Sequence, residues 1–261
     1  MKNAVLKVFL IILAVSVLTQ CKKSDHSGFE LVKIPKIITV QEMRALPVGL
    51  TSPIKVAKTG KIYIYEDFLF INEPQKGIHI FNNSNPAAPV NVAFLKVPGN
   101  VDLAVQNNIL YADSYVDLLA FDISSIADIK QIRRVKDVFL QFYNGGTEKE
   151  KYVIIYKDTL VKKAEYQGIY HYDATFNSGS KSGQGGSMAR FTLLNDHLYT
   201  VGSSDLSVFD VKTASNPGFV KSISLDWGVE TIFPYENKLF IGTNSGMHIF
   251  GASTAASPVK P

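Results

Sequence analysis

Residues 110–124 read LYADSYVDLLAFDIS, two short apolar stretches on either side of a polar turn. Similar stretches occur at 198–211 (LYTVGSSDLSVFDV), at 239–250 (LFIGTNSGMHIF) and at 69–81 (LFINEPQKGIHIF). The first leucine and the last phenylalanine are 11 residues apart in three of these stretches and 12 apart in the fourth. This recurrence indicates that one structural unit is repeated along the chain.

Turn-forming residues occupy equivalent places in every copy. Before each leucine lies a pair that tolerates positive φ or bonds its own backbone, namely Glu66-Asp67, Asn107-Asn108, Asn195-Asp196 and Glu236-Asn237. A second turn residue lies four positions before each phenylalanine, namely Gly77, Asp117, Asp205 and Gly246. A longer connection and another alternating apolar stretch follow. Each unit therefore predicts four antiparallel strands, and no helix is needed.

A single four-stranded sheet of this size cannot bury its own apolar faces, so neighbouring units must cover them. Radial stacking of such sheets gives a β-propeller, whose repeat is about 40 to 45 residues long. A β-sandwich is the alternative, although its strands need not repeat a common unit. We expect an all-β fold, a β-propeller of four-stranded blades over residues 51–261, with about four to five blades.

The repeat is irregular in two places. Residues 140–186 contain an imperfect unit, which predicts a degenerate blade followed by a flexible insertion, NSGSKSGQGG. The chain ends eleven residues after Phe250, where the fourth strand of that unit should begin. We therefore expect an incomplete propeller, part of a longer one, whose last blade lacks its outer strand. Alternatively, FELVKIPKIITV at 29–40 supplies that strand and closes a small ring.

The N-terminal residues predict export and a lipid anchor. Lys2 and Lys7 flank the start of an uncharged apolar run that is shorter than the roughly 20 residues needed to span a bilayer. This pattern predicts a signal peptide over residues 1–20. Cys21, the only cysteine, ends a stretch, LTQC, that resembles the lipobox of bacterial lipoproteins, so residues 21–50 would hold the anchor and an N-terminal linker or strand. The alternative is a secreted protein with an incidental thiol.

Charge excludes one class of partner. The chain has 27 Lys and Arg residues against 23 Asp and Glu residues, a net charge of +4 to which the lysines at the N-terminus contribute. The remainder is nearly neutral and has no basic stripe, so we expect no nucleic-acid binding.

Several phrases, among them GIHIFNNSNPAAPVNVAFLKVPGNVDLAV, LYADSYVDLLAFDIS and WGVETIFPYENKLFIG, resemble the LVIVD-repeat family of bacterial envelope lipoproteins. The resemblance covers most of residues 60–250. It implies a propeller and a lipid anchor in the cell envelope, on an outer-membrane lipoprotein, and it implies no activity or site that could be transferred.

Isolated polar residues give no metal or cofactor site. His79 and His248 occupy the same repeat position and are interpreted as strand residues, whereas His26, His171 and His197 share no ligand spacing. The stretch GSKSGQGG does not have the spacing of a phosphate-binding loop. Asn82, Asp122 and Asp210 follow strands and are interpreted as turn anchors that accept backbone N–H bonds.

The strongest candidate site lies where one repeat passes to the next. Equivalent strands should begin at Lys61, Asp102, Arg190 and Thr231, and innermost strands would place these side chains around one mouth of the central channel. Glu230 and Trp227 would join them. The alternative is that these charges pair with one another or face water.

These residues leave two classes of function open. The favoured one is a membrane-anchored module without enzymatic activity that binds a protein or a glycan through one face. The other is a hydrolase or lyase in which Asp102 and Glu230 act as acid and base.

Overall fold

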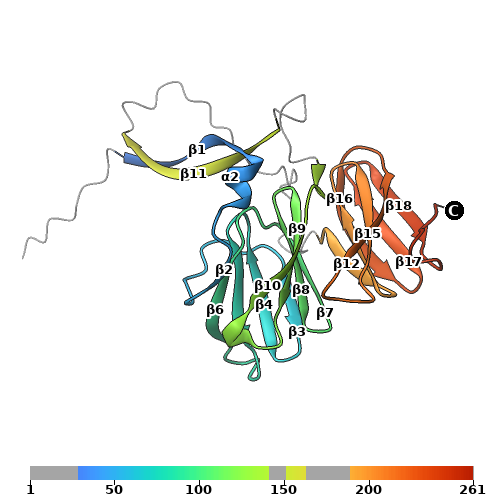
Figure 1. Cartoon of the computed structure of the whole chain (residues 1–261), viewed down its shortest axis with the longest axis horizontal. Helices are drawn as coiled ribbons and strands as arrows, with labels where there is room; N and C mark the ends of the chain where they lie inside the picture. Colours follow the sequence, from blue (N-terminus) through green and yellow to red (C-terminus); the bar gives the residue numbers. More distant parts are fainter. Residues whose placement is uncertain (1–28, 141–150, 163–188, 261) are drawn as a thin grey trace, which may run out of the picture. The chain divides into compact units, whose positions relative to one another are not determined.

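The computed structural model describes residues 29–140, 151–162 and 189–260. The chain forms two compact units, and the described part of the first comprises residues 29–36 and 156–162. The first unit contains much of a two-stranded sheet made by β1 (Phe29–Thr39) and β11 (Tyr152–Lys162), which both continue into the second unit (Figure 1). The second unit contains the repeats.

Four antiparallel sheets, which we call blades 1 to 4, make up the second unit. Blade 1 contains β3 (Ile62–Tyr65), β4 (Phe68–Glu73), β5 (Gly77–Asn82) and β6 (Val90–Lys96), and blade 2 contains β7 (Leu103–Gln106), β8 (Ile109–Ser114), β9 (Asp117–Asp122) and β10 (Lys130–Val135). Blade 3 contains β12 (Phe191–Leu194), β13 (His197–Val201), β14 (Asp205–Asp210) and β15 (Gly218–Ser224), and blade 4 contains β16 (Val229–Tyr235), β17 (Lys238–Thr243) and β18 (Gly246–Gly251).

The repeated leucine and phenylalanine are cross-strand partners in every blade. The pairs are Leu69 with Phe81, Leu110 with Phe121, Leu198 with Phe209, and Leu239 with Phe250. Because paired residues on neighbouring strands point to the same face of a sheet, each pair contributes to one face of its blade. The spacing read from the sequence is therefore the register of the two central strands.

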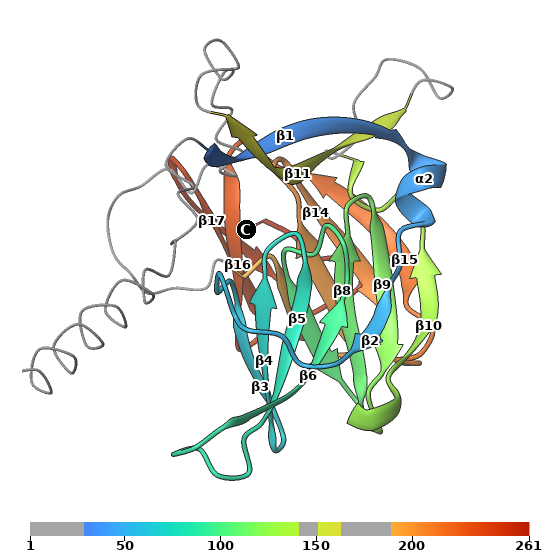
Figure 2. The ribbon, with the colours of Figure 1, turned by 90° about the vertical axis from the view of Figure 1, so that its left-hand side faces the viewer.

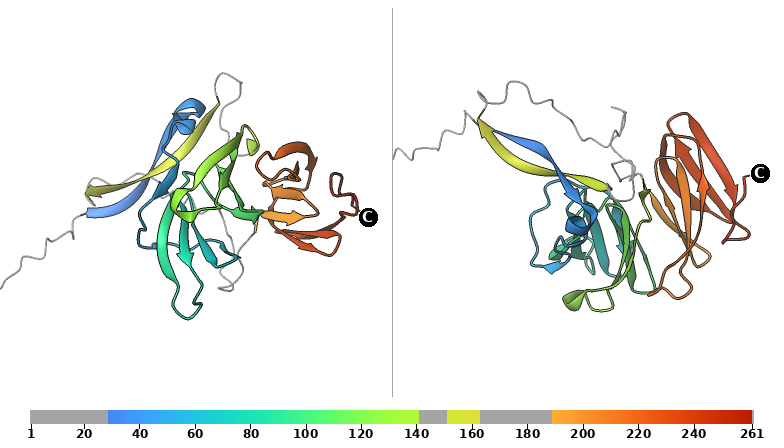
Figure 3. Two further views of the ribbon diagram at one scale, coloured as in Figure 1. Left: turned by 60° about the horizontal axis from the view of Figure 1, so that its bottom comes forward. Right: turned by 45° about the horizontal axis from the view of Figure 1, so that its top comes forward.

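The blades follow one another in an arc, with blade 1 and blade 4 at its two ends (Figure 3). Strand β3 contacts β7, β7 contacts β12, and β12 contacts β16, so these are the innermost strands. Separate hydrophobic clusters fill the spaces between blades 1 and 2, between blades 2 and 3, and between blades 3 and 4. The expected β-propeller is confirmed, and the β-sandwich alternative is wrong.

The predicted turns are also confirmed. Glu66, Asn107, Asn195 and Glu236 have φ values of 50°, 50°, 50° and 51° at the hairpins between the first two strands of each blade. The three turn anchors accept backbone N–H bonds from two residues further on, over 3.0 Å for Asn82, 2.9 Å for Asp122 and 2.9 Å for Asp210. Short polar side chains at these positions thus satisfy backbone donors where each strand ends.

The stretch at 29–40 does not complete the last blade, which was one of the two expectations for the chain ends. Blade 4 has three strands, and only an isolated bridge between Gly251 and Val259 follows them. The stretch 29–40 does not supply its missing strand, because β1 pairs with β11. Instead, β2 (Gly49–Thr51) pairs with β6 and gives blade 1 a fifth strand. The degenerate blade is not formed by residues 151–162, since blades 2 and 3 pack directly on each other.

Two short helices were not expected from the repeat. Helix α2 (Val40–Arg44) begins with a capping box in which Thr39 and Glu42 bond each other's backbone N–H groups. It is held against blade 2 by Arg44, whose Nε and Nη2 donate to both carboxylate oxygens of the buried Asp117 over 2.9 and 2.8 Å (Figure 2). A 3₁₀ helix, η2 (Ile126–Asp128), lies in the connection before β10.

Candidate functional site

The four equivalent positions predicted from the repeat lie at the innermost strands. Lys61, Asp102 and Arg190 immediately precede β3, β7 and β12, and Thr231 lies near the start of β16. Since these strands are consecutive neighbours, the repeat brings the first residues of the blades close together. The Nζ atom of Lys61 lies 2.8 Å from Oδ1 of Asp102, and the Asp102 side chain is buried.

Both partners of this ion pair are fully used. Asp102 also accepts backbone N–H bonds from Leu103 and Phe191, over 2.6 and 2.8 Å, and a further short one from Arg190. Lys61 donates to the carbonyl oxygens of Leu103 and Phe191 over 2.9 and 3.2 Å. A carboxylate has about four lone-pair sites and an ammonium has three donors, so no bonding capacity is left over.

This network joins blades 1, 2 and 3. It leaves no lone-pair site on Asp102 and no donor on Lys61 for an external ligand. Burial raises the pKa of Asp102, an effect that the ammonium of Lys61 opposes. Thr231 connects blade 4 to the start of blade 3, because its hydroxyl donates to the carbonyl oxygen of Ala189, the residue before Arg190, over 3.1 Å. Glu230 is only partly buried and Trp227 is 75% exposed. The geometry fits the interpretation in which the charges pair with one another.

A second buried polar group lies next to Asp102. Oδ1 of Asp113 on β8 accepts bonds from the side-chain amide of Asn100 and from the backbone N–H groups of Val101 and Asp102, each over 2.9 Å. Asn72 on β4 donates in turn to Asn100. Burial, aided by the charge of the neighbouring Asp102, raises the pKa of Asp113 to about 7, although the N–H bonds from Val101 and Asp102 oppose this rise.

Sequence analysis missed this second group, although the repeat contained a signal for it. Asn72 and Asp113 are both the third residue after the repeated leucine, a position that Val201 and Gly242 fill in blades 3 and 4. A polar residue at that position of an otherwise apolar strand requires a buried partner. The partner comes from the connection between blades 1 and 2, which lies outside the repeated stretches.

The histidines of the repeat lie on strands, as predicted. His79 on β5 is fully buried, with Nε2 2.7 Å from Oε2 of Glu73, and His248 on β18 lies 3.2 Å from Asp226. In the part of the chain that the structure describes, no group of three or more His, Cys, Asp and Glu side chains is arranged to hold a metal ion. His26, His171 and the loop at 177–186 lie outside the described residues, as does Cys21.

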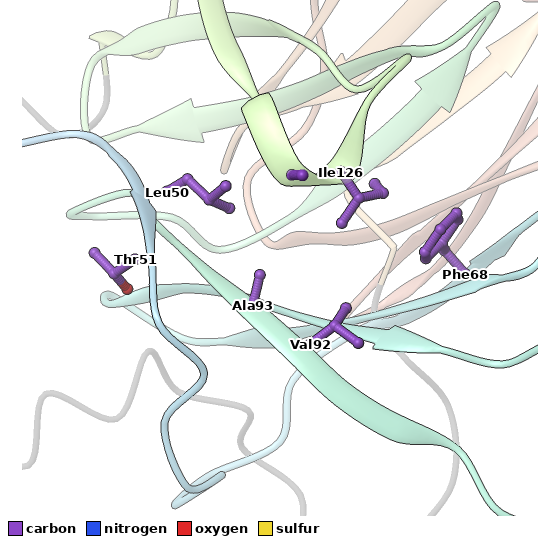
Figure 4. Close-up of a pocket in the computed structure, with 7 residues that line it drawn as sticks. Leu50, Thr51, Phe68, Val92, Ala93 and Ile126 are labelled. Carbon is purple, nitrogen blue, oxygen red and sulfur yellow. The ribbon is translucent and has the colours of Figure 1, made fainter.

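An apolar groove of about 410 Å³ runs between blades 1 and 2 on the outer side (Figure 4). It is lined by Leu50 and Thr51 of β2, Val92 and Ala93 of β6, Phe68 of β4, and Ile126 and Ala127 of η2. None of these seven residues is charged. The added strand β2 and the helix η2 form its two walls, and neither was predicted from the repeat.

No helix within the described residues is both long enough and apolar enough to cross a bilayer. No protein-family model matches the sequence, and no curated protein matches it.

Solved structures resemble the chain at low identity. The S. cerevisiae Dbp5 structure with Nup159, Gle1, IP6 and ADP is 10% identical, with a TM-score of 0.41, over 89% of this chain and 48% of that one. Kluyveromyces lactis Hsv2 is 13% identical, with a TM-score of 0.36, over 76% of this chain and 63% of that one. A protein from Lactobacillus plantarum is 11% identical, with a TM-score of 0.37, over 78% and 70%. The chain spans about half the length of the first of these.

Proposed function

We propose that this protein is a lipid-anchored, LVIVD-type propeller of the bacterial cell envelope that binds another protein through the apolar groove between blades 1 and 2. The β-propeller fold is a generic scaffold for binding, and the function belongs to a particular site on it. The groove is the observation that carries this proposal. It is a concave surface whose lining side chains are largely apolar, as binding pockets usually are.

The lining favours a protein over a glycan. Sugar hydroxyl groups need polar partners, and Thr51 is the only side chain with a hydrogen-bonding group among the seven that line the groove. Leu50, Val92 and Ile126 instead offer an environment for an aliphatic or aromatic side chain. We therefore infer that a partner protein inserts such a side chain.

The hydrolase alternative receives no comparable support. It requires Asp102 to exchange a proton with a substrate, and all the lone-pair sites of that carboxylate are taken by Lys61 and backbone N–H groups. Opening the site would break the bonds that join blades 1, 2 and 3.

The proposed anchor is supported by the sequence around Cys21 and by the nature of the first unit. Phe29, Leu31 and Leu160 on β1 and β11 are 42%, 64% and 62% exposed. The exposed lysines Lys33 and Lys36 lie on β1, the strand that contains Phe29 and Leu31. Apolar side chains with basic neighbours suit the surface of a membrane that contains anionic lipids.

Val92→Asp tests the groove, because the side chain is 38% exposed and lines it. Photo-crosslinking in the native membrane should identify a partner of the unaltered protein, and Val92→Asp should reduce its capture about tenfold, as loss of an interface anchor does. The matched control is Val220→Asp on β15, the fourth strand of blade 3, where the equivalent side chain is 40% exposed. Capture that is equal in the two variants, or that requires a glycan, would contradict the proposal.

A further inference from the structure

The wall of the groove that β2 forms is held by few contacts. Strand β2 pairs with β6 through three residues, and the hydroxyl of Thr51 adds a bond to the carbonyl oxygen of Phe94 over 3.0 Å. The segment that follows, residues 52–59, is exposed except for Val56. Short elements with few buried contacts are the first parts of a fold to open locally. We call residues 45–59, which contain β2, the strap.

One end of the strap is fastened to blade 1. The side-chain amide of Asn91 donates to the carbonyl oxygen of Ile54 over 2.8 Å, and the backbone N–H of Ala57 donates to Oε2 of Glu73 over 3.3 Å. Both contacts involve residues that follow β2 in the sequence. They fix the part of the strap that leads into β3, so the part before β2 depends on other contacts.

The other end of the strap is fastened to blade 2 through α2. Only residues 45–48 lie between Arg44, the last residue of α2, and the first residue of β2 (Figure 2). Arg44 donates to both carboxylate oxygens of Asp117, whose side chain is fully buried, and its Nη2 also lies 2.8 Å from Oδ1 of Asp137. A two-point bond to a buried carboxylate fixes the direction of the guanidinium as well as its distance.

The packing of the link ties the position of β2 to that of α2. Met43 of α2 is buried in a hydrophobic cluster that includes the turn between β8 and β9, and Leu46 packs against the same cluster. Val48 and Leu50 pack instead against the cluster between blades 1 and 2. Leu46 and Val48 are two residues apart, so the chain can separate them by at most about 7 Å. A displacement of α2 therefore displaces the residues that enter β2.

The shape of the groove depends on where β2 lies. Leu50 of β2 lines one wall, and Ile126 of η2 lies on the opposite wall (Figure 4). Beneath β2, Leu95 of β6 is fully buried. Its counterpart in blade 3, Ile223, has the same register but is only partly buried, and no described strand pairs with the outer edge of β15. Strand β2 therefore supplies the cover over β6, and a strap that lifts removes one wall of the groove.

We propose that the ion pair between Arg44 and Asp117 is a latch that holds the strap closed, so that Arg44 is a positioning residue for the groove although it does not line it. The inference rests on the proposed function for its effect on partner binding, whereas the latch itself does not depend on what the groove binds. The latch, the strap and the groove all belong to the second unit. Because the N-terminal part of the chain leads into α2, the latch also keeps movements of that part from reaching the groove wall.

Hydrogen exchange of the full chain, followed by mass spectrometry, tests the latch without any partner. Arg44→Met should make the amides of residues 46–58 exchange at least about tenfold faster, because charge-assisted bonds to a buried carboxylate are lost and only the short pairing of β2 remains. Amides of β13 and β14 in blade 3 should exchange as in the unaltered protein, which shows that the variant is folded. Arg44→Lys keeps one charged donor and should give an intermediate rate.

Arg134→Met is the matched control. From β10, Nη1 of Arg134 donates to Oδ2 of the same Asp117 over 2.8 Å, and its side chain is 16% exposed, against 23% for Arg44. The control removes an arginine from the same buried carboxylate and removes no contact of α2. We expect the exchange of the strap to change by less than about twofold in this variant.

Partner binding tests the effect of the latch on the groove. A photo-crosslinking amino acid in place of Ala127, which lines the groove on η2, captures the partner in membranes. If the strap without its latch is closed only about a tenth of the time, the apparent affinity falls about tenfold. Capture should therefore fall about tenfold in Arg44→Met, fall less in Arg44→Lys, and stay unchanged in Arg134→Met.

The two measurements separate a failure of the latch from a failure of the proposed function. Equal exchange of the strap in Arg44→Met and Arg134→Met would overturn the latch, whatever the groove binds. Faster exchange in Arg44→Met alone, with unchanged capture of a partner that Val92→Asp does release, would overturn the effect of the latch on binding. Faster exchange in Arg44→Met alone, with capture that Val92→Asp leaves unchanged, would support the latch and contradict the proposed function of the groove.

Discussion

At the scale of single residues, the buried carboxyl group of Asp113 couples protonation to folding. Burial raises its pKa to about 7, far above the value of an exposed aspartate. Between these two pKa values the folded protein holds a proton that the unfolded chain has released. Stability contributed by this group is therefore present at low pH and is lost as the pH rises through about 7.

We predict that Asp113→Asn removes this loss. The amide oxygen can still accept the three N–H bonds from Asn100, Val101 and Asp102, and it carries no charge at any pH. The variant should gain about 1–3 kcal/mol in the free energy of unfolding relative to the unaltered protein between pH 5 and pH 8, on the usual scale of about 1.4 kcal/mol per pKa unit. Urea unfolding at the two pH values measures this difference.

The effect must be read as the difference between Asp113→Asn and the unaltered protein, because other groups also titrate between pH 5 and pH 8. Asp210→Asn, at a turn anchor whose carboxylate is at the surface, serves as the control and should leave the pH dependence as it is in the unaltered protein. An Asp113→Asn variant with the same pH dependence as the unaltered protein would mean that Asp113 is ionised in the fold at neutral pH.

At the scale of structural elements, the register of the blades was predictable and their attachments were not. The spacing from Leu110 to Phe121 fixes a hairpin, because the residues must pair across two strands and the turn residues between them are short and polar. The bulges of blades 1, 2 and 3 recur at one repeat position, since the pairing skips Val92, Ile132 and Val220, each eleven residues after the repeated phenylalanine. Residue type alone did not identify them, because a β-branched apolar residue is equally common in a regular strand.

The short elements were missed for different reasons. Helix α2 has a recognisable start, since Thr39 and Glu42 have the spacing of a capping box, but it lies outside the repeat that guided the interpretation. Strand β2 is three residues long, and its pairing with β6 is a long-range contact that no local pattern encodes. The groove depends on β2 and η2, which is why a site in that place was not predicted.

For the candidate site at the innermost strands, the sequence predicted which positions come together. It did not predict what each side chain does there. Equivalent repeat positions brought Lys61 and Asp102 into contact, as expected from their place on the innermost strands. What the pair does depends on the backbone N–H groups of Arg190 and Phe191, whose directions follow from how blade 3 begins. Backbone direction in a connection is not readable from residue type.

The ion pair between Lys61 and Asp102 should contribute measurably to the stability of the fold, because it links the innermost strands. Lys61→Met leaves the Asp102 carboxylate buried without its cation and removes two bonds to carbonyl oxygens of blades 2 and 3. We expect a loss of about 3–5 kcal/mol in the free energy of unfolding, the range for removing one partner of a buried ion pair. Chemical denaturation of the purified variant measures this loss.

Lys58→Met, at an exposed lysine in the preceding segment, is the matched control and should change the stability by less than about 0.5 kcal/mol. If both variants were equally stable, Asp102 would be neutral in the fold, and the backbone N–H groups alone would hold the blade starts together.

At the scale of the whole molecule, the repeat determines both what the protein buries and what it exposes. A blade with two neighbours covers both faces, so the leucine, the phenylalanine and the aromatic residue after the leucine are buried in blade 2 and blade 3. Blades 1 and 4 have the same pattern, and among the described residues each packs against one other blade, so Ile64 and Phe233 are 64% and 61% exposed. Their exposed rows therefore have the same residue pattern as the buried rows of blades 2 and 3.

The last prediction concerns the tether. If acyl chains are attached at Cys21, the protein should sediment with membranes and resist extraction by high salt, because several buried chains hold a protein far more firmly than surface charges do. Cys21→Ser should move most of the protein to the soluble fraction. Any remaining association should be weak and should disappear at high salt, since the exposed Lys33 and Lys36 act through screened electrostatic attraction to anionic lipids.

Membrane fractionation, together with mass spectrometry of the mature N-terminus, measures both parts of this prediction. Ser24→Ala changes a neighbouring hydroxyl residue and should leave the fractionation as it is in the unaltered protein. A Cys21→Ser protein that stays in the membrane after a high-salt wash would contradict the lipid tether, as would a mature product that retains a free thiol. The groove would be unaffected by that result, because the residues that line it belong to β2, β4, β6 and η2.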